Sequence, residues 1–179
     1  MVGIIIVVVV IVLLIMWVVG CMNQLNMLDE RVNNALAQIE VNLTSRFDAL
    51  TGLLDLVKGY NEHEYKTLSD VISMRKVGHT TSDIQQNEDI ISQTVGRIVA
   101  TAESYPDLKS NQNYQNLMNS LNDYENKVRS TRMVANDCVT KLNALIRQIP
   151  YNFIAPIAGV SKRDYLKTED AKKEMPSMK

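Results

Sequence analysis

The chain opens with an unbroken apolar run, after which the pattern of apolar and polar positions changes sharply. Residues 4–19 are all apolar, and the first charged side chain is that of Asp29. A helix rises about 1.5 Å per residue, so about twenty residues span the ~30 Å hydrocarbon core of a bilayer. The pattern predicts a transmembrane helix over residues 1–22, a water-soluble body over residues 23–150, and a tail over residues 151–179 that is apolar and then charged.

The apolar run has three interpretations. A permanent single-pass helix is favoured over a cleaved secretory signal, because no basic residue precedes the run and no A-x-A-like site follows it. The third interpretation is a lipoprotein signal, since Val-Val-Gly-Cys at residues 18–21 resembles a loose lipobox; acylated Cys21 would then anchor a surface binding module. Trp17 suits the interfacial end of a retained helix. Arg31 and Arg46 follow the run and no basic residue precedes it, which favours a cytoplasmic body.

A single helical stripe follows the run. Its steps of three and four residues repeat mainly as 3-4-4, close to 3.67 residues per turn, which predicts a nearly straight or slightly right-handed helix. No proline precedes Pro106 and no glycine-rich hinge separates the stripe from the run, so we expect one nearly continuous rod. The stripe consists of Leu25, Leu28, Val32, Leu36, Ile39, Leu43, Phe47, Leu50, Leu54 and Val57.

Breaks in the pattern predict further helices. Gly59-Tyr60-Asn61 is the first plausible stop, although the apolar spacing also fits a helix that continues through Gly59. A second helix then ends near Lys76, before a glycine. Its apolar positions are Tyr65, Leu68, Val71 and Ile72.

The third and fourth helices have sharper boundaries. Residues 80–83, Thr-Thr-Ser-Asp, form an N-cap cluster, and the third helix stops at Tyr105 because a residue before proline is disfavoured in the α region. Ser110 or Asn111 caps a fourth helix, which Pro150 ends. The stripe of this helix comprises Tyr114, Leu117, Leu121, Tyr124, Val128, either Met133 or Val134, Val139, Leu142, Leu145, Ile146 and Ile149.

Four helices joined by short turns predict an all-α fold, an antiparallel up-and-down four-helix bundle behind the membrane helix. An even number of helices returns the chain to the membrane end, where the apolar segment 151–160 and the basic pair Lys162-Arg163 follow. We expect this segment to fold back and cap the bundle. The alternative is that it binds the lipid headgroup region. The charged residues after Lys167 are expected to fray.

Composition and motifs give little support for catalysis. A net charge of −1 and a pI of about 6.1 make no case for nucleic-acid binding. Cys21 and Cys138 have neither the spacing of a disulfide framework nor that of a metal site. His63 and His79 are the chain's two histidines, and no H-E-x-x-H motif is present. We therefore predict no enzyme activity, no catalytic or cofactor-binding residue and no metal site.

Two polar groups remain as candidates. Arg46-Phe47-Asp48 is expected to place a solvated pair on the surface, with pairing to a neighbouring helix as the alternative. A ligand-binding or cryptic catalytic bundle would use Arg132, Asn136 and Asp137. The plainer interpretation is that the Asn-Asp pair fixes a buried polar contact between helices.

Short motifs in a fixed order run through most of the chain. They are Trp17-Val18-Val19-Gly20, Arg46-Phe47-Asp48, Val57-Lys58-Gly59-Tyr60 with His63-Glu64, Tyr105-Pro106-Asp107-Leu108-Lys109 with Asn111, and Glu125-Asn126-Lys127-Val128 leading to Arg132, Asn136-Asp137, Asn143, Pro150, Asn152, Ile154 and Ala155. In this order and spacing they resemble the LemA family of bacterial membrane-anchored helical proteins. The chain departs from the family pattern at residues 49–52, where Ile-Pro-Asn is usual, at Ala135, where Tyr is frequent, and at Cys21.

The resemblance implies an antiparallel four-helix bundle behind one span of a bacterial cell membrane. Some relatives act in organising internal bacterial membranes. The predicted function is therefore a non-enzymatic scaffold at the lipid bilayer, which self-associates as a homo-oligomer or docks a membrane-protein partner.

Overall fold

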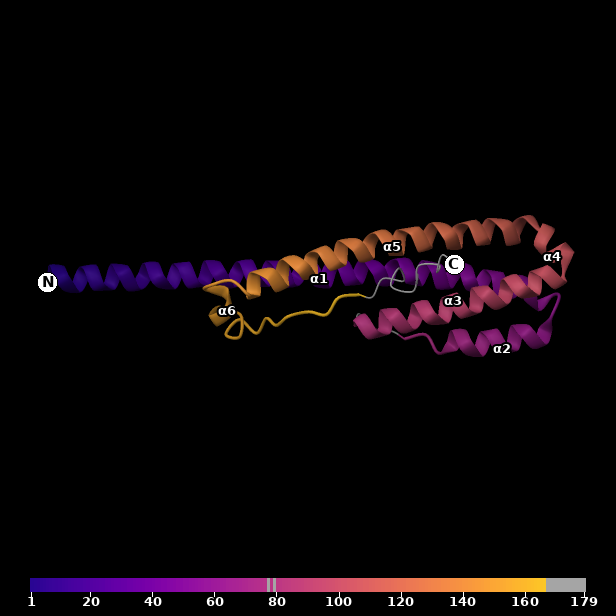
Figure 1. The fold of residues 1–179 in the computed structure, drawn as a ribbon, viewed down its shortest axis with the longest axis horizontal. Helices are drawn as coiled ribbons and strands as arrows, with labels where there is room; N and C mark the ends of the chain where they lie inside the picture. The colour runs from indigo at the N-terminus through magenta and orange to yellow at the C-terminus, as the bar shows by residue number, and fades with distance from the viewer. Residues whose placement is uncertain (77, 79, 167–179) are drawn as a thin grey trace, which may run out of the picture. The chain divides into compact units, whose positions relative to one another are not determined.

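The computed structural model describes residues 1–76, 78 and 80–166, and within these residues the regular structure is helical, without strands (Figure 1). The predicted all-α class is confirmed for this part of the chain. Its helices are α1 (Val2–Lys58), α2 (Glu62–Ser73), α3 (Thr81–Ser104), α4 (Pro106–Ser110), α5 (Gln112–Ile146) and α6 (Tyr151–Ile154). His79 and the charged tail from Lys167 onward lie outside the described residues.

Two compact units divide this fold. The first, the membrane-proximal unit, comprises residues 1–35 and 134–165. The second, the distal unit, comprises residues 36–133 and, among the described residues that follow, Leu166. Helices α1 and α5 each contribute one part to each unit. The predicted segments 1–22, 23–150 and 151–179 follow composition rather than contacts, and they stay a prediction.

Helix α1 confirms that the apolar run and the stripe belong to one helix, because it continues from Val2 to Lys58. Eight of the ten predicted stripe positions are buried, and Leu28 and Leu36 are half-buried. Periodicity identified them because residues three and four apart share one face of a helix. The buried positions are Leu25, Val32, Ile39, Leu43, Phe47, Leu50, Leu54 and Val57.

Capping residues set the boundaries in the distal unit. The side chain of Asn61 accepts a hydrogen bond from the Glu64 amide at 3.0 Å, so α2 starts anew after Gly59 and the alternative of a continuous helix is wrong. Thr80 caps α3 as predicted, accepting from the Asp83 amide at 3.1 Å. Asn111 accepts from the Asn113 amide at 2.8 Å and so precedes α5.

Helix α5 departs from its predicted pattern in two respects. It ends at Ile146, three residues before the predicted Ile149, and the chain turns before Pro150. Neither alternative at Met133 or Val134 is correct, because both side chains are exposed. Arg132 and Ala135 occupy the buried positions instead. The steps 128, 132, 135 and 139 keep helical spacing, but a sequence pattern does not count an arginine as a core residue.

The membrane-proximal unit has a core built from three segments. The contributing side chains come from α1, α5 and the segment around α6, which lies beside α1 in Figure 1. The Tyr151 hydroxyl donates to the side-chain oxygen of Gln24, which confirms that the chain returns to this part of α1. The buried side chains of the unit include Cys21, Leu25, Val32, Val139, Leu142, Leu145, Ile154, Ala155 and Val160.

Replacement of Gly96 tests the exposed face of α3. A β-carbon at this position meets no atom within 4 Å, and a mid-helix glycine costs about 0.5–1 kcal/mol relative to alanine. We expect Gly96→Ala to raise the free energy of unfolding by about that amount, measured by urea denaturation of the full chain in detergent with circular dichroism.

The matched position is Gly52, where a β-carbon would lie 3.3 Å from both methyl groups of Leu117. Gly52→Val is expected to lower the same free energy, because the larger side chain forces Leu117 to move. A destabilising Gly96→Ala variant would contradict the open surface at α3.

Candidate functional site

Polar side chains that could stabilise the fold or bind a ligand gather in three places. The first is a clamp in the membrane-proximal unit, the second a layer of buried ion pairs in the distal unit, and the third an open groove between α2 and α3. Each is described within its own unit. Among the residues that the structure describes, no group of three or more histidine, cysteine, aspartate or glutamate side chains is arranged to hold a metal ion.

The clamp, made by Asp29, Asn33, Asn143 and Arg163, ties the chain after α6 to α1 and α5. The guanidinium of Arg163 donates to both carboxylate oxygens of Asp29, at 2.9 and 3.0 Å, and to Asn33 at 3.3 Å. The backbone of Arg163 exchanges two hydrogen bonds with the Asn143 side chain, at 2.9 and 3.0 Å. Charge-assisted bidentate pairs of this kind are the stronger class of hydrogen bond. The clamp therefore holds residue 163 through both its side chain and its main chain.

Two tyrosines near the clamp have shifted pKa values of opposite sign. Desolvation raises the pKa of Tyr151, and the neighbouring Cys21 adds to the rise, so the Tyr151 hydroxyl stays protonated at neutral pH. Hydrogen bonds from Thr140 and then Asn143, with the positive charge of Arg147, lower the pKa of Tyr165. Tyr151 therefore contacts α1 through Cys21, and Tyr165 contacts α5 through Thr140 and Asn143.

Two ion pairs with buried arginines join helices of the distal unit. Arg132 of α5 pairs with Glu88 of α3, and each side chain is only 8% exposed. Arg46 of α1 pairs with Glu125 of α5 at 3.0 Å, and Arg46 is buried. The expected solvated pair at Arg46 is therefore wrong, and the alternative of pairing across helices is correct.

Asparagine and arginine side chains continue this polar layer. The amide group of Asn87, 2% exposed, makes two 2.9 Å hydrogen bonds with the backbone of Lys76. Arg75 donates to the hydroxyl of Thr44 at 2.8 Å, and its guanidinium lies 4.9 Å from the ring centroid of Phe47. These contacts hold Arg75 against α1 and Lys76 against α3.

The predicted polar group Arg132, Asn136 and Asp137 is divided between the two units. Arg132 belongs to the distal unit and pairs with Glu88, whereas Asn136 and Asp137 belong to the membrane-proximal unit. The Asp137 carboxylate is exposed and pairs with Lys141 within α5 at 3.2 Å, so it makes no buried contact between helices. Cys21 is buried, Cys138 is half-buried and both are free thiols, while His63 is exposed.

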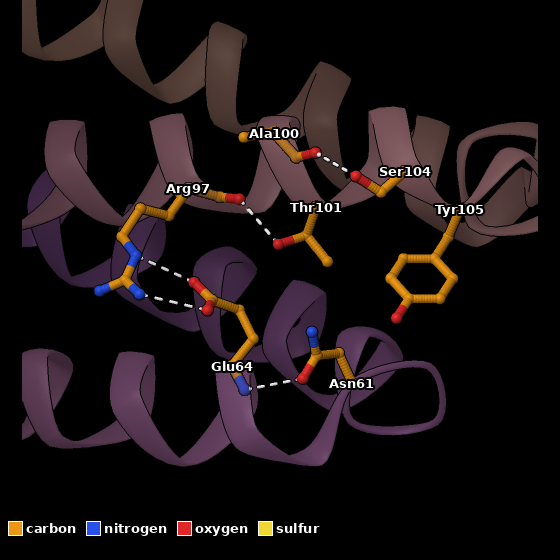
Figure 2. A pocket seen from close by; sticks show the side chains of 7 residues that line it. All are labelled: Asn61, Glu64, Arg97, Ala100, Thr101, Ser104 and Tyr105. Carbon is orange, nitrogen blue, oxygen red and sulfur yellow. Dashed lines mark hydrogen bonds and ion pairs between the residues drawn. The ribbon is translucent and has the colours of Figure 1, made fainter.

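The groove in Figure 2 has a volume of about 390 Å³ and a polar lining. Arg97 and Glu64 form a two-bonded ion pair across it, with Nε to Oε1 at 2.9 Å and Nη2 to Oε2 at 3.1 Å. The Thr101 hydroxyl donates to the Arg97 carbonyl, and the Tyr105 hydroxyl faces the space between the helices (Figure 2). The other lining residues are Asn61, Ala100 and Ser104.

The polar side chains of this groove are engaged mainly with one another and with the backbone. Its charges neutralise each other, and its hydroxyls at Thr101 and Ser104 donate to carbonyls one helical turn back. Nucleophilic catalysis needs a base beside the nucleophile, and none of the seven lining residues supplies that pair. Sequence reasoning missed the Glu64–Arg97 pair, because two charges 33 residues apart carry no periodic signal.

Removal of one partner from the Arg132–Glu88 pair is expected to destabilise the chain strongly. Arg132→Met leaves the Glu88 carboxylate buried without its cation, which costs about 3–5 kcal/mol of unfolding free energy. Adding Glu88→Gln should restore part of the loss, because the second substitution removes the uncompensated charge. The measurement is urea denaturation in detergent, followed by circular dichroism.

The matched control is Arg129→Met, on the same helix, where the pair with Glu125 is exposed and 3.5 Å long. A change below about 1 kcal/mol is expected there. Equal effects at the two arginines would contradict a special role for the buried pair.

Removal of the clamp is expected to loosen the segment that follows α5. Arg163→Gln abolishes the bidentate contact with Asp29, so amide hydrogen exchange over residues 151–160 should become faster in the full chain. Lys162→Gln removes a neighbouring exposed charge and serves as the control. Unchanged exchange in Arg163→Gln would show that the segment is held without the clamp.

Comparison with known proteins places this geometry in a family. The model of the LemA family matches residues 35–179. Magnetosome protein MamQ of Magnetospirillum gryphiswaldense is 31% identical over 77 residues, and magnetosome proteins MamQ 1 and MamQ 2 of Paramagnetospirillum magneticum are 30% identical over the same length. These matches cover 43% of this chain and 28% of each relative, so the chain spans little more than a quarter of the relatives it matches. The family model covers most of the chain and confirms the resemblance seen in its motifs: the chain belongs to the LemA family.

Proposed function

We propose that this chain is a non-enzymatic membrane scaffold, anchored by α1 and self-associating or docking a membrane protein through its body. The observation that carries the proposal is the exposure of the apolar run. Every side chain from Ile4 to Trp17 is about half exposed or more, and α1 is long and apolar enough to cross a membrane. Such a continuous apolar surface is costly in water and is the ordinary surface of a membrane span.

The body of this scaffold is proposed to be an antiparallel up-and-down four-helix bundle. Contacts between α1 and α5 in the distal unit support this arrangement, because the numbering falls on one helix as it rises on the other. Asn42 donates to Thr131, Arg46 pairs with Glu125, and Gly52 lies beside Leu117. The helices α2 and α3 complete the count, and the Glu64–Arg97 pair joins them.

A non-enzymatic role is supported by the use of the charged side chains. The buried arginines and glutamate pair between helices, Arg163 holds the tail, and the groove charges satisfy each other. The three relatives are named magnetosome proteins, and this name states no reaction. We propose that this chain likewise serves assembly at a bacterial membrane.

Orientation and the fate of Cys21 complete the proposal. Arg31 and Arg46 follow the span and favour a cytoplasmic body. Acylation would require Cys21 to become the first residue of the mature chain. Here Cys21 lies in the middle part of the long helix α1, and its side chain is buried and contacts Tyr151. The retained helix is therefore proposed over the lipoprotein.

Charge placed within the run tests the anchor. A Val9→Arg, Leu13→Arg variant should move from the membrane fraction to the soluble fraction, because each arginine near the centre of a span costs about 2.5–3.5 kcal/mol on insertion scales. Val9→Leu, Leu13→Ile keeps the apolar character and should stay with membranes after alkaline extraction. Intact mass spectrometry should find the wild-type chain starting at Met1; a mature chain starting at acylated Cys21 would overturn the retained span.

Orientation and self-association need two further measurements, one in cells and one in detergent. A cysteine introduced by Asn126→Cys, at an exposed position, should react with an impermeant maleimide only after cell lysis if the body is cytoplasmic. Light scattering in detergent should give a mass above that of one 20.2 kDa chain. A monomer across a wide concentration range would contradict self-association.

A further inference from the structure

Three large apolar side chains remain exposed where the chain turns from α5 into α6. Ile149, Phe153 and Ile157 are 80%, 67% and 75% exposed. Backbone hydrogen bonds from Ile154 to Pro150 and from Ala158 to Ile154 give residues 150–158 helical turns. Phe153 and Ile157, four residues apart, therefore lie on one face of these turns, and Ile149 directly precedes them. We call the three side chains the apolar foot.

The opposite side of the same segment is already used for packing. Ile154, Ala155 and Val160 are buried in the membrane-proximal unit. The segment therefore folds back onto the unit, as the favoured interpretation expected, and still presents a second apolar face. Core formation explains the first face but leaves the apolar foot without a function.

Contacts within the unit fix where the apolar foot lies along α1. The Tyr151 hydroxyl donates to Gln24, and Arg163 holds Asp29 (Figure 1 shows α6 beside α1). Gln24 is four residues beyond Gly20, about 6 Å along a helix. Headgroups extend about 5–8 Å beyond the hydrocarbon core on each side. With α1 spanning a bilayer as proposed, Tyr151 at the foot lies at the depth where acyl chains give way to headgroups.

The charges around the foot suit an anionic lipid surface. No acidic residue occurs between Asp137 and Asp164, whereas Arg147 and Lys162 are both exposed and flank the foot in the sequence. Each basic residue near an anionic membrane surface contributes about 1 kcal/mol. An apolar face flanked by basic side chains is the chemistry of an interfacial membrane contact.

We propose that the apolar foot inserts into the interfacial region of the leaflet where α1 leaves the bilayer, as a second contact with the membrane. The inference rests on the proposed membrane span of α1. Continuity of surface selects lipid over another protein, because the clamp places the foot beside the end of a run whose surface is already proposed to face lipid. The anchor holds the foot at the interface, so insertion is intramolecular and needs little intrinsic affinity.

Tryptophan fluorescence separates the foot from the anchor. Trp17 is the chain's one tryptophan and lies in the apolar run. The full chain is reconstituted in vesicles of phosphatidylcholine and phosphatidylglycerol that carry bromine at either a shallow or a deep acyl position. Three proteins are compared: the wild type, Trp17→Phe with Phe153→Trp, and Trp17→Phe with Asn34→Trp. Asn34 is exposed in the same unit and lies fourteen residues beyond Gly20, about 21 Å along α1.

The expected result is loss of emission from Trp17 and from the Phe153→Trp variant, the latter more with shallow bromine than with deep bromine. The Asn34→Trp control should keep its emission. Adding Ile149→Ser and Ile157→Ser to the Phe153→Trp variant should restore most of its emission, while circular dichroism confirms that helix content is unchanged.

Each other outcome counts against a specific statement. Quenching of Trp17 without quenching of the Phe153→Trp variant overturns the foot and leaves the anchor intact. Absence of quenching at Trp17 overturns the anchor, and the proposed function with it. A blue-shifted but unquenched Phe153→Trp variant means that protein, such as a second copy of this chain, covers the foot instead of lipid.

Discussion

Both units depend on the burial of one apolar stripe along α1. Leu25 and Val32 carry it into the membrane-proximal unit, and Leu43, Phe47 and Leu50 carry it into the distal unit. A buried leucine or phenylalanine contributes about 1.5–3 kcal/mol relative to its exposed state, so this single row outweighs any one polar contact in the structure. The stripe stays on one face of α1 because no proline or hinge interrupts the helix before Lys58.

Aliphatic packing alone does not specify which helix faces which. Ion pairs of buried arginines supply that information in the distal unit, because buried Arg132 meets Glu88 and buried Arg46 meets Glu125. A shift of one helix by a residue would leave a charge buried without its partner, at a cost of several kcal/mol. Asn87 adds a similar constraint at Lys76, since the oxygen and the nitrogen of its side-chain amide are both matched to the Lys76 backbone.

The sequence predicts the long helices well because their signals are local. Spacing, the Thr80 cap and the proline after Tyr105 all act within one or two turns, and the structure follows them. The short helices α4 and α6 escaped prediction, since five and four residues contain too few turns to show a period. The burial of Arg132 and the Glu64–Arg97 pair escaped prediction for another reason. Tertiary packing brings Glu88 to Arg132 and Arg97 to Glu64, and one sequence does not reveal that packing.

The segment after α5 shows why two sequence interpretations that look exclusive can describe one piece of chain. A helical turn has two sides. One side of this segment packs in the membrane-proximal unit, where Ile154 and Val160 are buried. Phe153 and Ile157 lie on the other side, where water is an unfavourable neighbour. The Arg163 clamp orders this segment regardless of lipid, so its conformational entropy is already lost before any membrane contact forms. A segment ordered in advance beside a membrane helix binds an interface at a lower entropic cost than a free amphipathic tail of the same composition.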